Sequence, residues 1–185
     1  STMFAQPFAG TTRGSDRRRA KDQLRSLGYL RLAGDGLSTY LDGVRITLSR
    51  QAWHEDGDRV RDDGRRNLES FDSVMLGLDV QFDTQLSLID LIYGFDIYRD
   101  TVDSGRRDFN PNGQLDRVRI QGPIGDDARF TQAGGYVEGI LLPHPRMRIE
   151  LGSRYTRVAA VVGRFEDPQT SGAARFSDNW TQWVN

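Results

Sequence analysis

The chain has 185 residues, of which 37% are hydrophobic and 28% are charged, with a formal net charge of -1 and no cysteine. This length predicts one domain, the near-zero net charge argues against a nucleic-acid partner, and the lack of cysteine excludes disulfides and thiolate metal sites. No apolar run approaches the roughly 18 residues of a membrane-spanning helix, which leaves membrane crossing by half-apolar strands open.

The first residues, 1–24, are polar and carry the run Arg17-Arg18-Arg19, so we expect a loop. They lack the basic start and apolar centre of a signal peptide. We therefore expect the sequence to begin within a longer protein or after removal of a leader.

Alternating segments then begin, at 25–33 and 41–52, with a brief turn expected around Asp35-Gly36. In the second segment, aliphatic residues alternate with polar ones: Val44, Ile46 and Leu48 lie between Arg45, Thr47 and Ser49. The stretch 54–69 is densely charged and predicts a long loop.

Further along, segments 73–82 and 89–98 alternate in the same way and are joined by the short connection 83–87. A second long polar stretch, 101–129, follows them and again predicts a loop.

The last third of the chain repeats this arrangement. Segments 130–142 and 146–158 flank the tight turn Pro143-His144-Pro145, and a third long polar stretch covers 163–179. A seventh segment opens at Trp180.

Strict alternation predicts strands with one apolar and one polar face. Segments of about 9–13 residues match the roughly 9–11 residues with which a tilted strand crosses a bilayer. The connections alternate between short and long, as in outer-membrane barrels, whose turns are tight on one side and extended on the other. The prediction is an all-β, antiparallel up-and-down transmembrane β-barrel, present in part with about six to seven strands. A soluble β-sandwich, a lipocalin-like barrel or a solenoid is the alternative.

The polar face of these segments carries charges, whereas the opposite face has none until near the strand ends, as at Arg157. We expect the polar face to line a lumen and the apolar face to contact lipid, where a charge costs about 2–4 kcal/mol at the midplane. The charged residues of the polar face are Asp79, Asp90, Asp96, Glu138, Arg148, Glu150 and Arg154.

Residues 91–100, 132–138 and 147–155 resemble consecutive barrel strands of TonB-dependent receptors, with the patterns Tyr-Gly-x-Asp in the first and Gly-x-Arg-Tyr in the last. The resemblance implies an outer-membrane transporter with a 22-stranded barrel that takes up a scarce ligand such as a ferric siderophore, haem or cobalamin. The family also has an N-terminal plug that couples through its TonB box to inner-membrane energy.

Neither a plug nor a TonB box is recognisable in residues 1–185, so the chain resembles the middle of such a barrel. The resemblance implies as partners the outer-membrane lipid, the remainder of the barrel and the plug, with the TonB complex reached only through the plug. An iron chelate or haem is the implied ligand. No nucleic acid is expected to bind.

Trp53 and His54, at the start of the first long charged stretch, are the candidate outer-loop ligand contacts. No spacing of nucleophile and base suggests catalysis, and we expect no catalytic residue, metal ligand or cofactor-binding residue. A passive porin or adhesin is the main alternative function, and an outer-membrane hydrolase or a soluble binding module is a weaker one.

Two registers follow from pairing the apolar faces. A turn centred between Gln85 and Leu86 places Leu78 opposite Tyr93, and a turn centred on His144 places Glu138 opposite Glu150. The short connections are expected at one end of the sheet and the long stretches, 53–70, 101–129 and 163–179, at the other.

Overall fold

The computed structural model describes residues 16–144, 146–166 and 173–184, which form one antiparallel sheet. The strands are β1 (Asp16–Ser38), β2 (Leu41–Arg61), β3 (Arg66–Leu86), β4 (Ile89–Phe109), β5 (Leu115–Arg119), β6 (Asp126–His144), β7 (Met147–Glu166) and β8 (Ala173–Val184). No helix long and apolar enough to cross a membrane occurs among the described residues.

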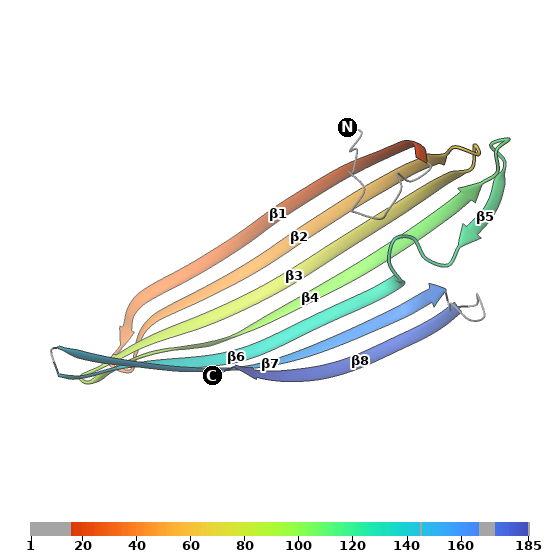
Figure 1. The fold of residues 1–185 in the computed structure, drawn as a ribbon. Coiled ribbons are helices and arrows are strands. Elements are labelled where there is room, and N and C mark those ends of the chain that lie inside the picture. The colour runs from red at the N-terminus through yellow and green to blue at the C-terminus, as the bar shows by residue number, and fades with distance from the viewer. Residues whose placement is uncertain (1–15, 145, 167–172, 185) are drawn as a thin grey trace.

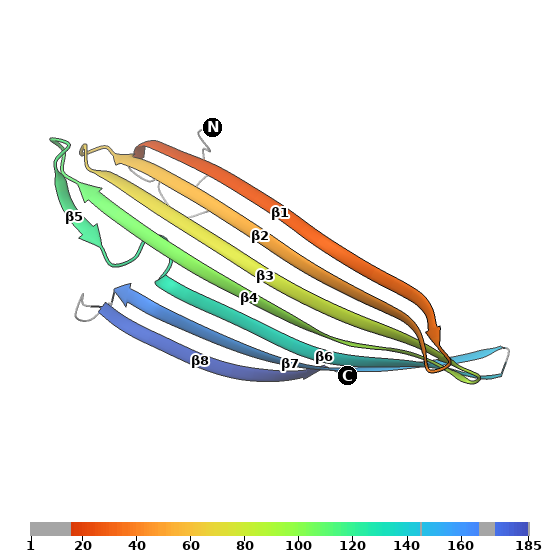
Figure 2. The same ribbon diagram turned by 180° about the vertical axis from the view of Figure 1, so that it is seen from behind.

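The sheet is an up-and-down meander in which each long strand pairs with its neighbour in the chain, in the order β1-β2-β3-β4-β6-β7-β8. The short β5 pairs with the last part of β4, beyond the point where β6 pairs with it. The tight connections β1–β2, β3–β4 and β6–β7 gather at one end, here called the turn end, and the others at the opposite loop end (Figures 1 and 2). The predicted fold class and topology are confirmed.

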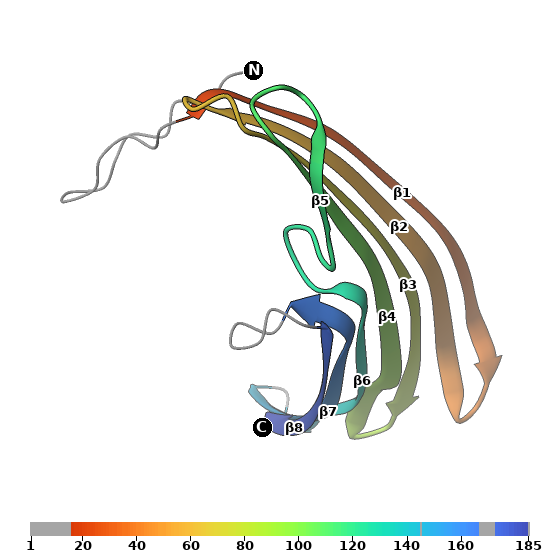
Figure 3. The same cartoon turned by 90° about the vertical axis from the view of Figure 1, so that its right-hand side faces the viewer.

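The sheet is curved into an open arc, with β5 on its inner side (Figure 3). Side chains on the concave face crowd together, whereas those on the convex face splay apart. In β4, Asp96 is 5% exposed, but its sequence neighbours Phe95 and Ile97 on the other face are 46% and 42% exposed. The apolar face of the predicted strands is therefore the convex one, and the charged face lines the hollow.

The convex face is apolar only in the half nearest the turn end. In β4 this band covers 89–97 and in β7 it covers 147–155, about the 9–11 residues that cross a bilayer. β4 nevertheless has 21 residues. About half of the strand thus lies beyond the band, toward the loop end.

The described parts of the stretches predicted as long loops are largely strand, so that prediction is wrong for them; residues 167–172 of the third stretch lie outside the description. β2 continues to Arg61 and β3 resumes at Arg66, leaving a tight turn in which Gly64 has a φ of 83°. Cross-strand ion pairs hold this region together. Asp58, for example, accepts a hydrogen bond from Arg66 Nε at 2.7 Å and pairs with Arg18.

Three other boundaries also differ from the prediction. Residues 16–24, predicted as a loop, belong to β1, while residues 1–15 lie outside the description. Gly36 has a φ of 65° and lies in a bulge of β1, so the turn itself comes later, before Leu41. β8 begins at Ala173 rather than at Trp180.

Both predicted registers are wrong by an even number of residues. Leu78 pairs with Ile97 instead of Tyr93, because the strands run on to Leu86 and Ile89 and leave only a two-residue turn. Phe82 therefore lies opposite Tyr93, and their rings stack at 5.3 Å.

In the second hairpin Glu138 pairs with Gly152 instead of Glu150. Even shifts leave every side chain on its predicted face. The assignment of the two faces therefore survives both errors.

Candidate functional site

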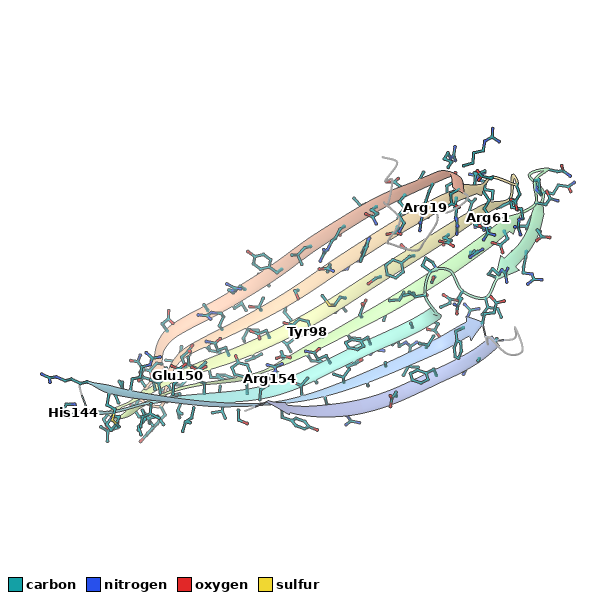
Figure 4. All side chains as sticks on the ribbon, viewed as in Figure 1. Arg19, Arg61, Tyr98, His144, Glu150 and Arg154 are labelled. Carbon is teal, nitrogen blue, oxygen red and sulfur yellow. The ribbon has the colours of Figure 1, made fainter. Side chains whose placement is uncertain are left out.

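The concave face, as the inner wall of the arc, is the candidate functional surface. Tyr98 and Arg154 lie midway along it, Glu150 and His144 lie toward the turn end, and Arg19 and Arg61 lie at the loop end (Figure 4). Its side chains come from alternate positions of each strand, so the strand pairing sets their spacing.

At mid-height, two tyrosines lie across glycines of the neighbouring strand. Tyr98 is directly opposite Gly77, and Tyr136 is directly opposite Gly94. A Cβ on Gly77 would come within 2.7 Å of the Tyr98 ring, and one on Gly94 within 2.8 Å of Tyr136 Oη. The missing side chains therefore make room for the two aromatic rings on this wall.

The same layer holds an ion pair between β4 and β7, across the intervening β6, in which the aspartate is buried and the arginine is half-buried. Arg154 Nη2 donates to Asp96 Oδ1 at 2.5 Å, and the Arg154 guanidinium lies 5.9 Å from the centre of the Tyr136 ring. Gly134 leaves space for the arginine, because a Cβ there would be 2.5 Å from Nη2. The Asp96–Arg154 ion pair, the Tyr136 ring and Gly134 thus pack against one another.

Nearer the loop end, Asp108 is the centre of a polar network. Its carboxylate accepts hydrogen bonds from Asn67 Nδ2 at 2.6 Å and from Arg106 Nε and Arg119 Nε at 2.7 Å each. Arg119 also donates to Glu166 at 3.0 Å. The network therefore ties β3, β4, β5 and β7 together.

This setting controls the charge of the Asp108 carboxyl. Burial raises its pKa, but the hydrogen bonds from Arg106, Arg119 and Asn67 outweigh burial, so the pKa lies below its ordinary value. The group is ionised at neutral pH and fixes its two arginines in place. The result is a charge-paired surface at the loop end of the wall.

Trp53 and His54, the candidate contacts from the sequence, lie on β2 and point to opposite faces. Trp53 is on the concave face, where its ring meets Phe71 edge-on at 5.5 Å. His54 is on the convex face beyond the apolar band. The structure therefore does not bring the two together, and a ligand in the hollow has access to Trp53 alone.

His54 lies between two carboxylates on the convex face. Its Nδ1 is 2.7 Å from Asp72 Oδ1, and its Nε2 is 3.2 Å from Asp56 Oδ2. The hydrogen bond to Asp72 and then that to Asp56 raise the pKa of His54 above the ordinary 6.5. Among the described residues, no group of three or more His, Asp or Glu side chains is arranged to hold a metal.

We expect Asp72→Asn to lower the pKa of His54 toward 6.5, because it removes the main partner of the protonated ring. The stabilisation from protonated His54 is fully present below about pH 6.5 and is lost as pH rises through the higher folded-state pKa. An NMR titration of histidine-labelled protein measures this. The chain has two histidines, so His144→Gln leaves one signal to follow. An unchanged midpoint in Asp72→Asn would contradict the pairing.

Sequence reasoning missed the Asp108 network, because Asn67, Asp108 and Arg119 lie in stretches predicted as loops. It also missed the packing of the tyrosines on Gly77 and Gly94, which depends on register. The spacing of Arg106 and Asp108, two residues apart in a strand, was the one available signal that both share a face.

These features define a class of structure: a curved, antiparallel up-and-down sheet of the kind found in outer-membrane β-barrels, apolar on its convex face and polar on its concave face. No family model and no curated protein matches the sequence. Among solved structures, the chain is similar to the copper transporter OprC, with a TM-score of 0.68 and 17% identity over 86% of this chain. The match covers 26% of that protein, so the chain spans about a quarter of its length. At this identity the likeness shows the fold alone.

Proposed function

We propose that this chain forms part of the wall of an outer-membrane transport receptor of the TonB-dependent type. The observation that supports this most is the division between faces: the convex band is free of charge, while the concave face at the same height carries the ion pair Asp96–Arg154. Lipid on one side and a hydrated lumen on the other account for that division. The likeness to a transporter fold agrees with it.

The unpaired edge strands of the sheet are an argument that the chain is part of a larger barrel. Among the described residues, β1 pairs only with β2 and β8 only with β7. Unpaired strand edges are not satisfied by lipid. The remainder of the barrel is therefore the proposed partner along both edges, with a plug inside the hollow that couples transport to the TonB complex.

The height of the wall favours a receptor over a passive porin. β2, β3 and β4 each have 21 residues, twice what crossing requires. Their outer halves hold structured side chains, including Trp53 with Phe71 and the Asp108 network, rather than flexible loops. Such a surface can recognise a ligand before it enters the lumen.

A hydrolase finds less support. The described partners of His54 are two carboxylates, and His144 Nδ1 accepts a hydrogen bond from the backbone N–H of Arg146 at 3.2 Å. Neither ring is hydrogen-bonded to a serine or threonine hydroxyl in the described part of the chain.

The aromatic pair suits an organic chelate better than a bare ion. The described residues contain no cluster of metal ligands, whereas Trp53 and Phe71 offer ring surface to a planar, partly apolar molecule. We therefore propose an iron chelate or haem as the cargo, with Trp53 as a contact.

The experiment measures uptake of haem and of 55Fe-labelled catecholate and hydroxamate chelates by cells that carry the intact protein. We expect uptake of one of them to stop when an uncoupler collapses the inner-membrane proton gradient. Trp53→Ala should weaken its binding about tenfold, since stacking on an aromatic side chain is commonly worth about 1–3 kcal/mol.

His54→Ala is the matched control, because it removes the next side chain along β2 but on the opposite face. It should leave binding unchanged. Uptake that continues with the uncoupler would favour a porin, and equal losses in both variants would contradict the assignment of Trp53.

A further inference from the structure

A row of arginines marks the outer limit of the convex band. Counted from the band toward the loop end, the first charged convex residue is Arg50 on β2, Arg99 on β4, Arg129 on β6 and Arg157 on β7. In β1 and β3 an aspartate occupies the corresponding place. Arginine can lay its apolar stem along the band and hold its guanidinium at the lipid–water boundary.

Three of these arginines, Arg50, Arg99 and Arg157, are exposed and form no ion pair with another described residue, whereas Arg129 lies 3.5 Å from Asp127. Of the three, Arg50 and Arg99 border the same apolar groove. Several arginines in the outer half of the wall are instead paired across strands, as Arg66 is with Asp58. An exposed cation pair at the edge of an apolar surface is complementary to anionic groups at that boundary.

An apolar groove lies between these two charges. Its volume is about 660 Å³, and its lining includes Gly28, Leu30, Leu48, Leu76, Arg50 and Arg99. Gly28 is directly opposite Arg50, and a Cβ built on it meets nothing within 4 Å. Arg99 also borders a second hollow of about 340 Å³ that reaches Arg129. The two hollows therefore form one apolar surface on the convex face, bordered by Arg50, Arg99 and Arg129.

The spacing of the cations favours a headgroup with two phosphates. Arg50 and Arg99 both flank Leu76, one on each neighbouring strand. Two strand separations amount to about 10 Å. A single phosphate can approach one guanidinium closely, while a headgroup with two phosphates can engage both, and the acyl chains can lie in the groove.

We propose that this groove is a binding site for a multiply acylated glycolipid with two headgroup phosphates, in the outer leaflet around the barrel. Arg50 and Arg99 bind the phosphates, and the groove beside Gly28 holds an acyl chain. The proposal rests on the outer-membrane location proposed above. It concerns the convex face and does not depend on which ligand is transported.

The test uses the intact protein extracted in mild detergent, with bisphosphorylated lipid A as the probe and native mass spectrometry to count bound lipid. We expect wild type to retain the probe. The double variant Arg50→Gln, Arg99→Gln should bind it about 30-fold more weakly, because each basic residue at an anionic membrane surface contributes about fivefold. Gly28→Leu should reduce retention by filling the groove, without a clash in the sheet.

Arg45→Gln is the matched control, since Arg45 lies on the concave face of β2, and it should bind as wild type does. Equal binding by the double variant would overturn the proposal. So would equal binding of dephosphorylated lipid A, which would leave an unspecific acyl groove, or equal displacement by phosphatidylglycerol, which would leave a general anionic surface. Membrane fractionation separates these results from failure of the proposed location, since every variant must first be found in the outer membrane.

Discussion

Gly94→Ala is expected to destabilise the barrel by about 1–3 kcal/mol or more, the usual cost of overpacking a filled site. An added Cβ would be 2.8 Å from Tyr136 Oη and closer still to the backbone carbonyl oxygen of Val80. The tyrosine could rotate away, but the carbonyl belongs to the paired strand β3 and cannot move without breaking the ladder. Urea unfolding of the intact protein in detergent micelles measures the loss.

The control for this substitution is Gly135→Ala on the adjacent strand. Its Cβ would lie 3.7 Å from the carbonyl oxygen of Gly94, an ordinary contact. It adds the same methyl group on the neighbouring strand, on the convex face beside Phe95, and should change stability by no more than about 0.5 kcal/mol. If both variants unfold alike, the close approach of the Val80 carbonyl and of Tyr136 to Gly94 is not what limits this position.

Arg154→Leu is expected to have the other large effect, a loss of about 3 kcal/mol. The substitution leaves the Asp96 carboxylate buried with no cation, and breaking a buried pair costs more than the pair itself contributes. Asp96 Oδ2 has no hydrogen-bond partner among the described residues, so little remains to compensate. The same unfolding measurement applies.

Removing both charges tests whether the loss in Arg154→Leu comes from the isolated Asp96 carboxylate or from lost packing around Arg154. We expect the double variant Arg154→Leu, Asp96→Leu to recover much of the lost stability, because no isolated charge is then left in the wall. Arg148→Leu serves as control. Arg148 and Glu150 are 59% and 53% exposed, and such a pair contributes about 0–1 kcal/mol. A loss in Arg148→Leu equal to that in Arg154→Leu would show that burial of Asp96 is not the cause.

The sequence was sufficient for the faces and the topology because both depend on polarity. Ile97 and Asp96 differ enough in polarity to be assigned to the apolar and the polar face without any structure. This difference in polarity between the two faces is lost beyond the apolar band, where the side chains on both faces are mostly polar. In β3, one face carries Ser70 and Asp72 beside Leu68, and the other carries Asn67 and Glu69. Neither face is consistently apolar, so the outer strands were predicted as loops.

The strand register was the second feature that could not be predicted from the sequence. It also determines which side chains of the candidate site lie next to each other. The alternation in 89–97 is satisfied by any even shift, so it cannot select Ile97 over Tyr93 as the partner of Leu78. The choice is made by a two-residue turn that contains an apolar residue, Leu88, which the turn rules do not favour. Without the register, the approach of Arg154 to Asp96 across β6 could not be found.

The uninterrupted pairing of β3 with β4 has a consequence for how this wall could change in length. All pairs from Arg66 with Phe109 to Leu86 with Ile89 follow without a bulge. Inserting one residue would move every side chain beyond it to the opposite face of the sheet, whereas inserting two would raise the rim and leave both faces intact. Viable insertions and deletions within this hairpin should therefore come in even numbers, matched on the two strands, so that the rim can grow taller while the boundary at Arg99 stays where it is.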